Sequence, residues 1–454
     1  MDVAGWVAAL DAVVELIGRR FTRVEPRRRA GTYMRGLLAG LERKNGWTLA
    51  EHAGELSPDG TQRLLRTADW DVEGVRDDLR GYVLEHLGDA ASGVFVIDET
   101  GFIKKGVRSA GVQRQYTGTT GKIDNCQLGV FLAYASNRGR ALIDRELYLP
   151  TSWTEDPGRC ARAGIPSEAG FATKPQLGVA MLTRAYRAGV LSGASWVTAD
   201  EAYGQNPTFR AWLVDHEVPF VLATRNDDVL ISPDGHRRQA KVLATLAGHG
   251  KGGGWERRAI GPGAHGMRIY DWTAVTLDPA GLPDGWAHWL LVRRQTEPAE
   301  GKTVRELAFY RCAAPAKTPL RELIRVAGAR WAIEECFQTA KNEAGLDHYQ
   351  VRSWRAWYAH ITLAMLAAAY LAATRATEHH SPPKRGISNR PPAADPALGQ
   401  RDPPHPRRHR PRTDRLPRAR PGLVRLASTP TTSSPDLPLP PARPTTTSIL
   451  VPLQ

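Results

Sequence analysis

The apolar positions in the first ninety residues recur at helical spacing. This pattern covers residues 2–18 and 26–43, and it returns in the segment VRDDLRGYVLEHL at residues 75–87. Side chains at positions i, i+3, i+4 and i+7 share one face of a helix, so the pattern indicates amphipathic helices. The sequence therefore predicts an all-helical N-terminal domain over residues 1–90.

From residue 94 the pattern changes to short runs of apolar and β-branched residues, each bounded by Gly, Asn or Pro. Segments of helical periodicity near residues 174–188 and 208–216 alternate with the later runs. Strands that alternate with helices are typical of a mixed α/β core, and we place the first part of this core at residues 91–225. The predicted strands are residues 94–98, 126–135, 141–149, 195–200 and 219–225.

The next stretch combines Gly-rich turns with β-rich runs such as IYDWTAVTL and WAHWLLVRR. This combination predicts a β-rich insertion over residues 226–312. Helical periodicity returns between residues 320 and 375, so residues 313–378 are expected to form a C-terminal helical part of the core.

The tail, residues 379–454, has a different composition. From Ser381 onward it contains 18 of the 33 prolines and no Phe, Trp or Tyr. Such a segment lacks the apolar mass to bury a core, so we predict that it is disordered. We favour a frameshift that replaced the original C-terminus, and a nucleic-acid-binding arm is the alternative.

Charge is concentrated in this tail. The 454 residues include 61 Lys and Arg against 47 Asp and Glu, a net charge of +14. Residues 381–454 hold 13 of these cations and 4 of the acids, which gives +9 and leaves only +5 for the rest. The body is therefore not a general polycation. Six arginines between residues 19 and 29 could be either a solvated face or a surface that contacts phosphates.

Cysteine and apolar content indicate the compartment. The four cysteines are far apart and form no C-x-x-C pair, which argues against a zinc ribbon and a disulfide scaffold. The longest candidate membrane stretch, residues 361–374, is shorter than the ~20 residues that a span requires. We expect a cytoplasmic protein with no membrane association.

Two aspartates occupy equivalent places. VFVIDETG puts Asp98 at the end of an apolar strand, and SWVTADEAYG puts Asp200 at the end of another. A carboxylate at the C-terminal end of a strand in an α/β sheet points into the crevice where ligands bind. Each aspartate is followed directly by a glutamate, Glu99 or Glu201, and a glycine lies close behind.

A third carboxylate lies in the helical segment RWAIEECFQTAKNEAGLDHYQ. At 100° per residue, Arg330, Glu334 and Lys341 fall at about 0°, 40° and 20°, so one helix face presents a carboxylate between two cations. An ordinary i,i+4 ion pair with a solvated lysine is the alternative. Glu335 lies on a different face and is the weaker candidate.

Together these residues could bind metal ions. Carboxylate oxygens from Asp98, Asp200 and Glu334 suit Mg²⁺, with Mn²⁺ as a possible substitute. Two such ions can stabilise both the attacking and the leaving oxygen of a phosphodiester displacement. Arg330 and Lys341 would then bind phosphates beside the metals.

The run VFVIDETGFIKKGVRSAGVQRQYTGTTGKIDNCQLGVFLAYAS, followed by WVTADEAYG and RWAIEECFQTAKNEAGLDHYQVRSW, resembles bacterial insertion-sequence DDE transposases of the insertion sequence 701 group. The resemblance covers most of residues 20–375. It implies an RNase H-like catalytic core with a β-rich insertion. The family signature Y-x2-R-x3-E-x6-K matches Arg330, Glu334 and Lys341, whereas its Tyr position is Ala327.

The resemblance implies hydrolysis at terminal inverted repeats of double-stranded DNA, followed by strand transfer into target DNA. Asp98 would bridge both metals, and Asp200 and Glu334 would each hold one. A hairpinned DNA intermediate would be possible, and the enzyme would act as a homodimer or higher oligomer in the cytoplasm, associated with the nucleoid. Lys104, Lys105, Arg114 and Lys122 could line a DNA path or be solvated cations of a hairpin. Two alternatives remain: a metal-dependent nuclease without strand transfer, and an inactive remnant that only binds DNA ends.

Overall fold

The computed structural model describes residues 3–249, 254–263, 266–298 and 303–380. All described residues fall in one compact unit. The predicted boundaries near residues 90 and 225 lie between elements, whereas the one at residue 312 is wrong because it falls inside the strand formed by Leu307–Pro315. The first two residues of the predicted disordered tail, 379 and 380, are helical. The rest of the tail, and its interpretation as a frameshift product, lie outside the described residues.

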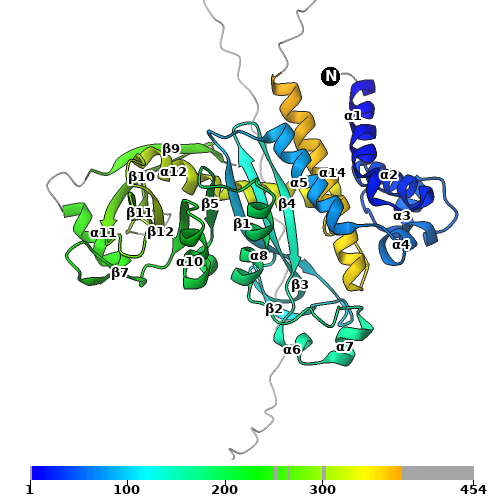
Figure 1. Cartoon of the computed structure of the whole chain (residues 1–454), viewed down its shortest axis with the longest axis horizontal. Coiled ribbons are helices and arrows are strands. Elements are labelled where there is room, and N and C mark those ends of the chain that lie inside the picture. The colour runs from blue at the N-terminus through cyan, green and yellow to red at the C-terminus, as the bar shows by residue number, and fades with distance from the viewer. Residues whose placement is uncertain (1–2, 250–253, 264–265, 299–302, 381–454) are drawn as a thin grey trace, which may run out of the picture. The chain divides into compact units, whose positions relative to one another are not determined.

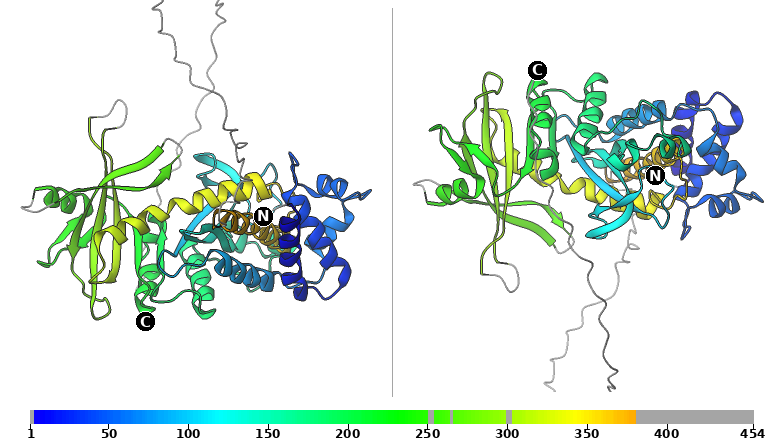
Figure 2. Two further views of the ribbon diagram at one scale, coloured as in Figure 1. Left: turned by 90° about the horizontal axis from the view of Figure 1, so that it is seen from above. Right: turned by 90° about the horizontal axis from the view of Figure 1, so that it is seen from below.

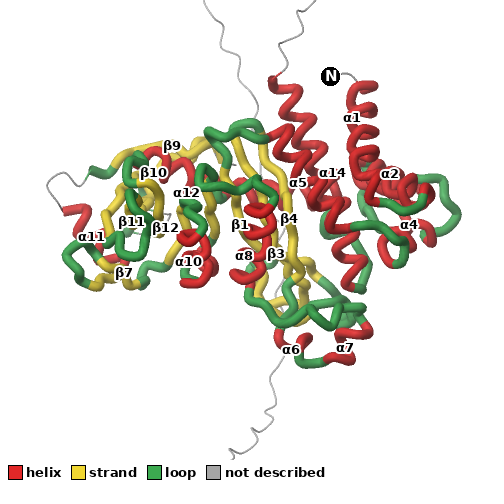
Figure 3. Tube along the Cα trace, viewed as in Figure 1, coloured by secondary structure: helices red, strands yellow, loops and turns green. Residues whose placement is uncertain are grey.

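The N-terminal segment is helical, and it contributes no strand to the main sheet (Figure 3). Its elements are α1 (Val3–Leu16), the 3-10 helix η1 (Ile17–Arg20), α2 (Val24–Leu38), α3 (Gly46–His52), α4 (Asp59–Arg66) and α5 (Val72–Leu87). The short helix α3 begins at a capping box in which the side chain of Asn45 accepts hydrogen bonds from two backbone amides. Several clustered arginines are ion-paired: Arg19 and Arg20 both bind Asp78.

A ten-stranded sheet confirms the predicted mixed α/β architecture. Its path runs β2-β3-β1-β5-β6-β12-β11-β10-β9, and β4 pairs with β3. The first strands are β1 (Val94–Ile103), β2 (Gln113–Thr117), β3 (Lys122–Ser136), β4 (Gly139–Leu147), β5 (Trp196–Ala199) and β6 (Phe220–Thr224). β3 is antiparallel to β1, whereas β1, β5 and β6 are parallel. The whole of β5 is buried, as expected for a strand covered on both faces.

The following stretch extends the same sheet. Strand β12 pairs antiparallel with β6, so β12, β11, β10 and β9 continue the sheet beyond the first core strands. The segment also contains a small hairpin and a helix that the sequence pattern did not indicate. These elements are β7 (Val229–Ile231), β8 (Arg237–Gln239), α11 (Ala240–His249), β9 (Glu256–Gly263), β10 (Gly266–Leu277), β11 (Trp286–Gln295) and β12 (Leu307–Pro315).

Helices cover the sheet on both faces (Figures 1 and 2). They are α6 (Thr151–Thr154), α7 (Pro157–Arg162), α8 (Lys174–Arg187), α9 (Glu201–Gly204), α10 (Pro207–Asp215), α12 (Leu320–Ala329), α13 (Trp331–Ala344) and α14 (Trp354–His380). α8 contacts β3 and β4, whereas α12 contacts β5 and β6, and α13 contacts β1, β3 and β4.

Helix α14 joins the N-terminal helices to the sheet. It packs against β4, α5 and α13. Among the described residues it is the one helix long and apolar enough for a membrane span, but 89% of its apolar window is buried within the protein. Such burial is what the core helix of a globular protein shows. Nε2 of the buried His360 ring donates a hydrogen bond to the Gly345 carbonyl, and its Nδ1 accepts one of 2.7 Å from the Tyr33 hydroxyl on α2.

Candidate metal centre

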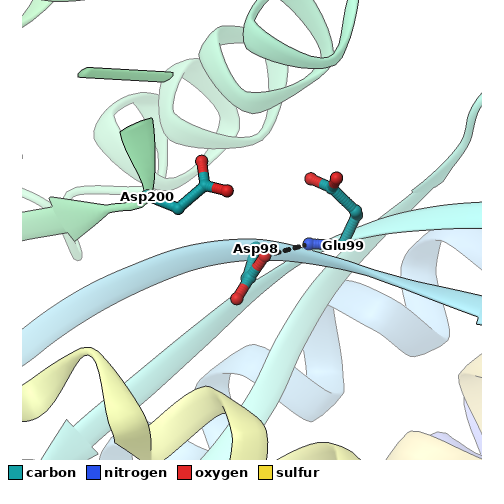
Figure 4. A group of neighbouring side chains, drawn as sticks. All are labelled: Asp98, Glu99 and Asp200. Carbon is teal, nitrogen blue, oxygen red and sulfur yellow. Dashed lines mark hydrogen bonds between the residues drawn. The ribbon is translucent and has the colours of Figure 1, made fainter. Parts of the chain in front are cut away.

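Three carboxylates converge where the parallel pairing of β1 with β5 ends. The predicted end of the first strand at residue 98 is wrong, because β1 continues along β3 to Ile103. Asp98 and Glu99 lie on β1, and Asp200 directly follows β5; one ligand oxygen from each lies within 4.8 Å of the others (Figure 4). The pairing of Ile97 with Ala199 in the β1–β5 register brings the two aspartates to the same edge. Local sequence and strand pairing together therefore build this site.

Each carboxylate has a defined partner. Asp98 accepts a 2.8 Å hydrogen bond from the backbone amide of Glu99, and Asp200 caps α9 by accepting one of 3.0 Å from the Ala202 amide. Glu99 binds the Lys174 ammonium and accepts a 3.1 Å hydrogen bond from the Tyr203 hydroxyl. These contacts orient all three groups before any ligand binds.

The crowded carboxylates alter one another's protonation. Burial raises the pKa of Asp98 to about 7, assisted by the negative charges of Asp200 and Glu99 and opposed by Arg330. The pKa of Asp200 is also raised, by burial and then by Glu99. A buried group of like charges is stabilised by protons or by a cation. Three carboxylates that each offer an oxygen ligand fit a divalent ion such as Mg²⁺.

Glu334 lies outside this group of three. The Arg330 guanidinium is between two acids, with its nitrogens 3.9 Å from Asp98 Oδ2 and 3.6 Å from Glu334 Oε1. The Glu334 side chain is 51% exposed, whereas that of Asp98 is 16% exposed. The structure thus brings together two of the three predicted carboxylates, adds Glu99, and links Glu334 to them through Arg330.

Sequence reasoning did not select Glu99 as a ligand. Its position directly after Asp98 was visible, but neighbouring strand residues normally point to opposite faces of a sheet. Its fixed orientation depends on Lys174 and Tyr203, which lie 75 and 104 residues further along the chain. The weaker candidate Glu335 lies on another face of α13 and pairs with Arg140. Ala327, at the Tyr position of the signature, is buried in α12.

The predicted DNA-binding cations fall into two groups. Lys341 donates a 2.8 Å hydrogen bond to Thr100 Oγ1, and the Lys104 ammonium lies 3.4 Å from the centroid of the Tyr349 ring. Burial lowers the pKa of both lysines, that of Lys104 to about 7.

The second group comprises Lys105, Arg114 and Lys122, which are exposed on β2, β3 and the preceding loop. No ion pair joins any of these three to a carboxylate of the described residues. Their charges are therefore available to an anionic partner, although a solvated hairpin remains the alternative.

Comparisons with known proteins agree with this chemistry. A family described as "DDE superfamily endonuclease" matches residues 18–277, a range that includes both aspartates. The chain is 26% identical over 325 residues to a protein of Microchaete diplosiphon named "Probable transposase for insertion sequence element IS701". That alignment spans 70% of this chain and 74% of the relative.

Proposed function

The chain belongs to the DDE superfamily of endonucleases and is a DDE transposase, and from this premise we propose how it acts on DNA. It cuts double-stranded DNA at the terminal inverted repeats of its element in a reaction that requires a divalent metal. It then joins the freed ends to target DNA. The observation that carries the proposal is that Asp98 and Asp200 lie side by side where the parallel pairing of β1 with β5 ends.

The proposed core is RNase H-like. Its support is the mixed sheet with strand order β4-β3-β1-β5-β6, in which β4, β3 and β1 are antiparallel and β1, β5 and β6 are parallel. The acidic residues lie within β1 and directly after β5, where the pairing of these two strands ends. Helix α13 packs against β1 and so places Arg330 beside Asp98. The β-rich segment from β7 to β12 lies between Asp200 and α13 in the sequence, as an insertion into such a core would.

Asp98 and Asp200 would hold the metal, with either Glu99 or Glu334 completing the ligand set. Mg²⁺ or Mn²⁺ would supply Lewis acidity, an activated water and charge neutralisation at the phosphodiester. Glu99 is already bound by the Lys174 ammonium and the Tyr203 hydroxyl. Glu334 is half-exposed, and within the described residues its one ion pair is with Arg330 at 3.6 Å. We assign Glu334 as the third ligand on that basis.

Arg330 has a separate role in this proposal. Its planar guanidinium can bind two phosphate oxygens at once, which a lysine cannot do. When it binds DNA, its contacts with Asp98 and Glu334 are weakened, and both carboxylates become available to the metal. We place Lys341 further along the same helix, where it would bind the DNA backbone.

The proposed enzyme works in the cytoplasm, on the nucleoid, as a homodimer or higher oligomer that holds two DNA ends. A nuclease that cuts without joining is the first alternative, and an inactive protein that only binds ends is the second.

The test is incubation of purified protein with a labelled fragment of its element's end and a supercoiled target plasmid, with Mg²⁺ or with EDTA. We expect metal-dependent cleavage and a joined product, both lost in Asp98→Asn. Cleavage without joining would favour the nuclease, and a gel shift without cleavage would favour the inactive remnant.

Matched glutamate variants test the third ligand. Glu334→Gln should abolish cleavage while DNA binding persists, and the adjacent Glu335→Gln should cut normally because Glu335 pairs with Arg140 on another face. Loss of cleavage in Glu99→Gln together with normal cleavage in Glu334→Gln would reassign the third ligand to Glu99.

A further inference from the structure

Three guanidinium groups gather around one indole ring at the start of α13. The guanidinium carbons of Arg268, Arg293 and Arg330 lie 4.5, 5.1 and 5.8 Å from the centroid of Trp331. Arg268 comes from β10 and Arg293 from β11, so two of the three belong to the β-rich segment. Arg293 also lies 4.6 Å from the ring centroid of Tyr270. The cluster therefore joins the β-rich segment to the catalytic helix.

Close packing holds this junction in place. Gly328, three residues before Trp331, faces β9 so closely that a Cβ atom added there would lie 3.1 Å from the Cβ of Ile260. Helix α12 also contacts β10. Because Gly328 has no side chain, α12 packs closely against β9 just before Trp331.

The charges of Arg268 and Arg293 are not neutralised by acids. No carboxylate in the described part of the chain forms an ion pair with either side chain. Two other arginines of the β-rich segment do form ion pairs: Arg257 and Arg294 both pair with Asp271, at 2.9 and 3.3 Å. Stacking on an aromatic face attracts a cation without cancelling its charge, and arginine stays protonated at any pH that a protein experiences.

Hydrogen bonding is also incomplete at this cluster. Nε of Arg268 and one terminal nitrogen of Arg293 are buried and have no acceptor among the described residues. Buried donors without acceptors are rare in folded proteins, and they are often explained by a function. Both residues are partly exposed as a whole. Such a set of donors fits an anion with several oxygens.

We infer that Arg268 and Arg293, supported by the face of Trp331, form a binding site for backbone phosphates of DNA beside the metal centre. This inference rests on the proposed function for its choice of ligand. The planar guanidinium matches the geometry of phosphate oxygens, and phosphate contacts of this kind position DNA without reading its sequence. Arg330 follows α12 directly and reaches Asp98, so it connects this phosphate site to the carboxylates. The β-rich segment thereby holds DNA in register with the reacting phosphodiester.

The salt dependence of DNA binding tests this site. A fluorescein-labelled duplex carrying the element's end would be titrated with wild type, Arg268→Gln and Arg293→Gln at several salt concentrations in EDTA. Each lost phosphate contact should reduce the slope of log K against log salt by ~0.9. Arg258→Gln is the matched control, because exposed Arg258 on β9 loses the same charge but pairs with Glu256. We expect its slope to equal that of wild type.

Arginine modification of the unaltered protein gives a second readout if the glutamine variants fail to fold. Phenylglyoxal should label Arg268 and Arg293 less when the duplex is bound, whereas labelling of Arg258 should not change. Unchanged slopes in folded variants, or equal labelling with and without DNA, would overturn the site. Neither result depends on catalysis, so the proposed function would still be judged by cleavage and joining in wild type and Asp98→Asn.

Discussion

Replacing Asp98 by Asn should stabilise the metal-free protein, by an amount that increases with pH. In the native protein the pKa of Asp98 is raised from 3.8 to about 7, chiefly by burial and then by Asp200 and Glu99. Between these two values the native state retains a proton that the unfolded chain releases, so the stability of wild type decreases as pH rises. The asparagine side chain of the variant has no proton to lose.

The magnitude follows from these two pKa values. One pH unit corresponds to 1.36 kcal/mol, so ionisation of Asp98 lowers the free energy of unfolding by ~4 kcal/mol at pH 7 and above. At pH 5 this loss in the free energy of unfolding is ~1.6 kcal/mol, and below pH 3.8 it disappears because Asp98 is protonated in both the native and the unfolded state. The advantage of the variant should thus grow by ~1.4 kcal/mol per pH unit between pH 4 and 7.

Urea unfolding in EDTA at pH 5, 6 and 7.5, followed by tryptophan fluorescence, measures this difference. Asp215→Asn serves as the control because Asp215 is exposed at the end of α10. Adding Mg²⁺ at pH 7.5 should stabilise wild type but not Asp98→Asn, since binding to the native state alone raises the free energy of unfolding. A difference between wild type and Asp98→Asn that does not change with pH would refute the electrostatic account of this site.

Three other perturbations test the scaffold and the DNA contacts. Burial lowers the pKa of His360 to about 3, so wild type should lose up to ~1.4 kcal/mol per pH unit as pH falls below 6.5, and His360→Gln should lack this dependence in acid-unfolding curves. Arg145→Met should lower the free energy of unfolding by ~1.5–3 kcal/mol in urea melts, because it removes the hydrogen bonds of a fully buried guanidinium to Glu73, which keeps its ion pair with Arg76. Lys341→Ala should reduce the salt slope of DNA binding by ~0.9; an unchanged slope would leave Lys341 with its structural hydrogen bonds to Thr100 and Gly101 alone.

The sequence determined the local structure and part of the site. Helical spacing predicted α1, α2 and α5, and apolar runs predicted β1, β5 and β6, because these patterns follow directly from the periods of a helix and a strand. The short helices α3 and α4, with seven and eight residues, are too brief to show a clear period. Asp98 and Asp200 could be grouped from the sequence because each directly follows an apolar strand run. The sequence did not show that β1 continues past Asp98 to Ile103, because that extension is paired with β3.

Tertiary structure decided which other groups meet these two residues. Glu99 joins them through Lys174 and Tyr203, and Glu334 is linked to Asp98 by Arg330. The antiparallel pairing of β12 with β6 makes the β-rich segment part of the main sheet, and it brings arginines of that segment onto Trp331. These contacts join residues far apart in the chain. Hydrophobic periodicity carries no information about such pairings, because the packing of whole elements selects them.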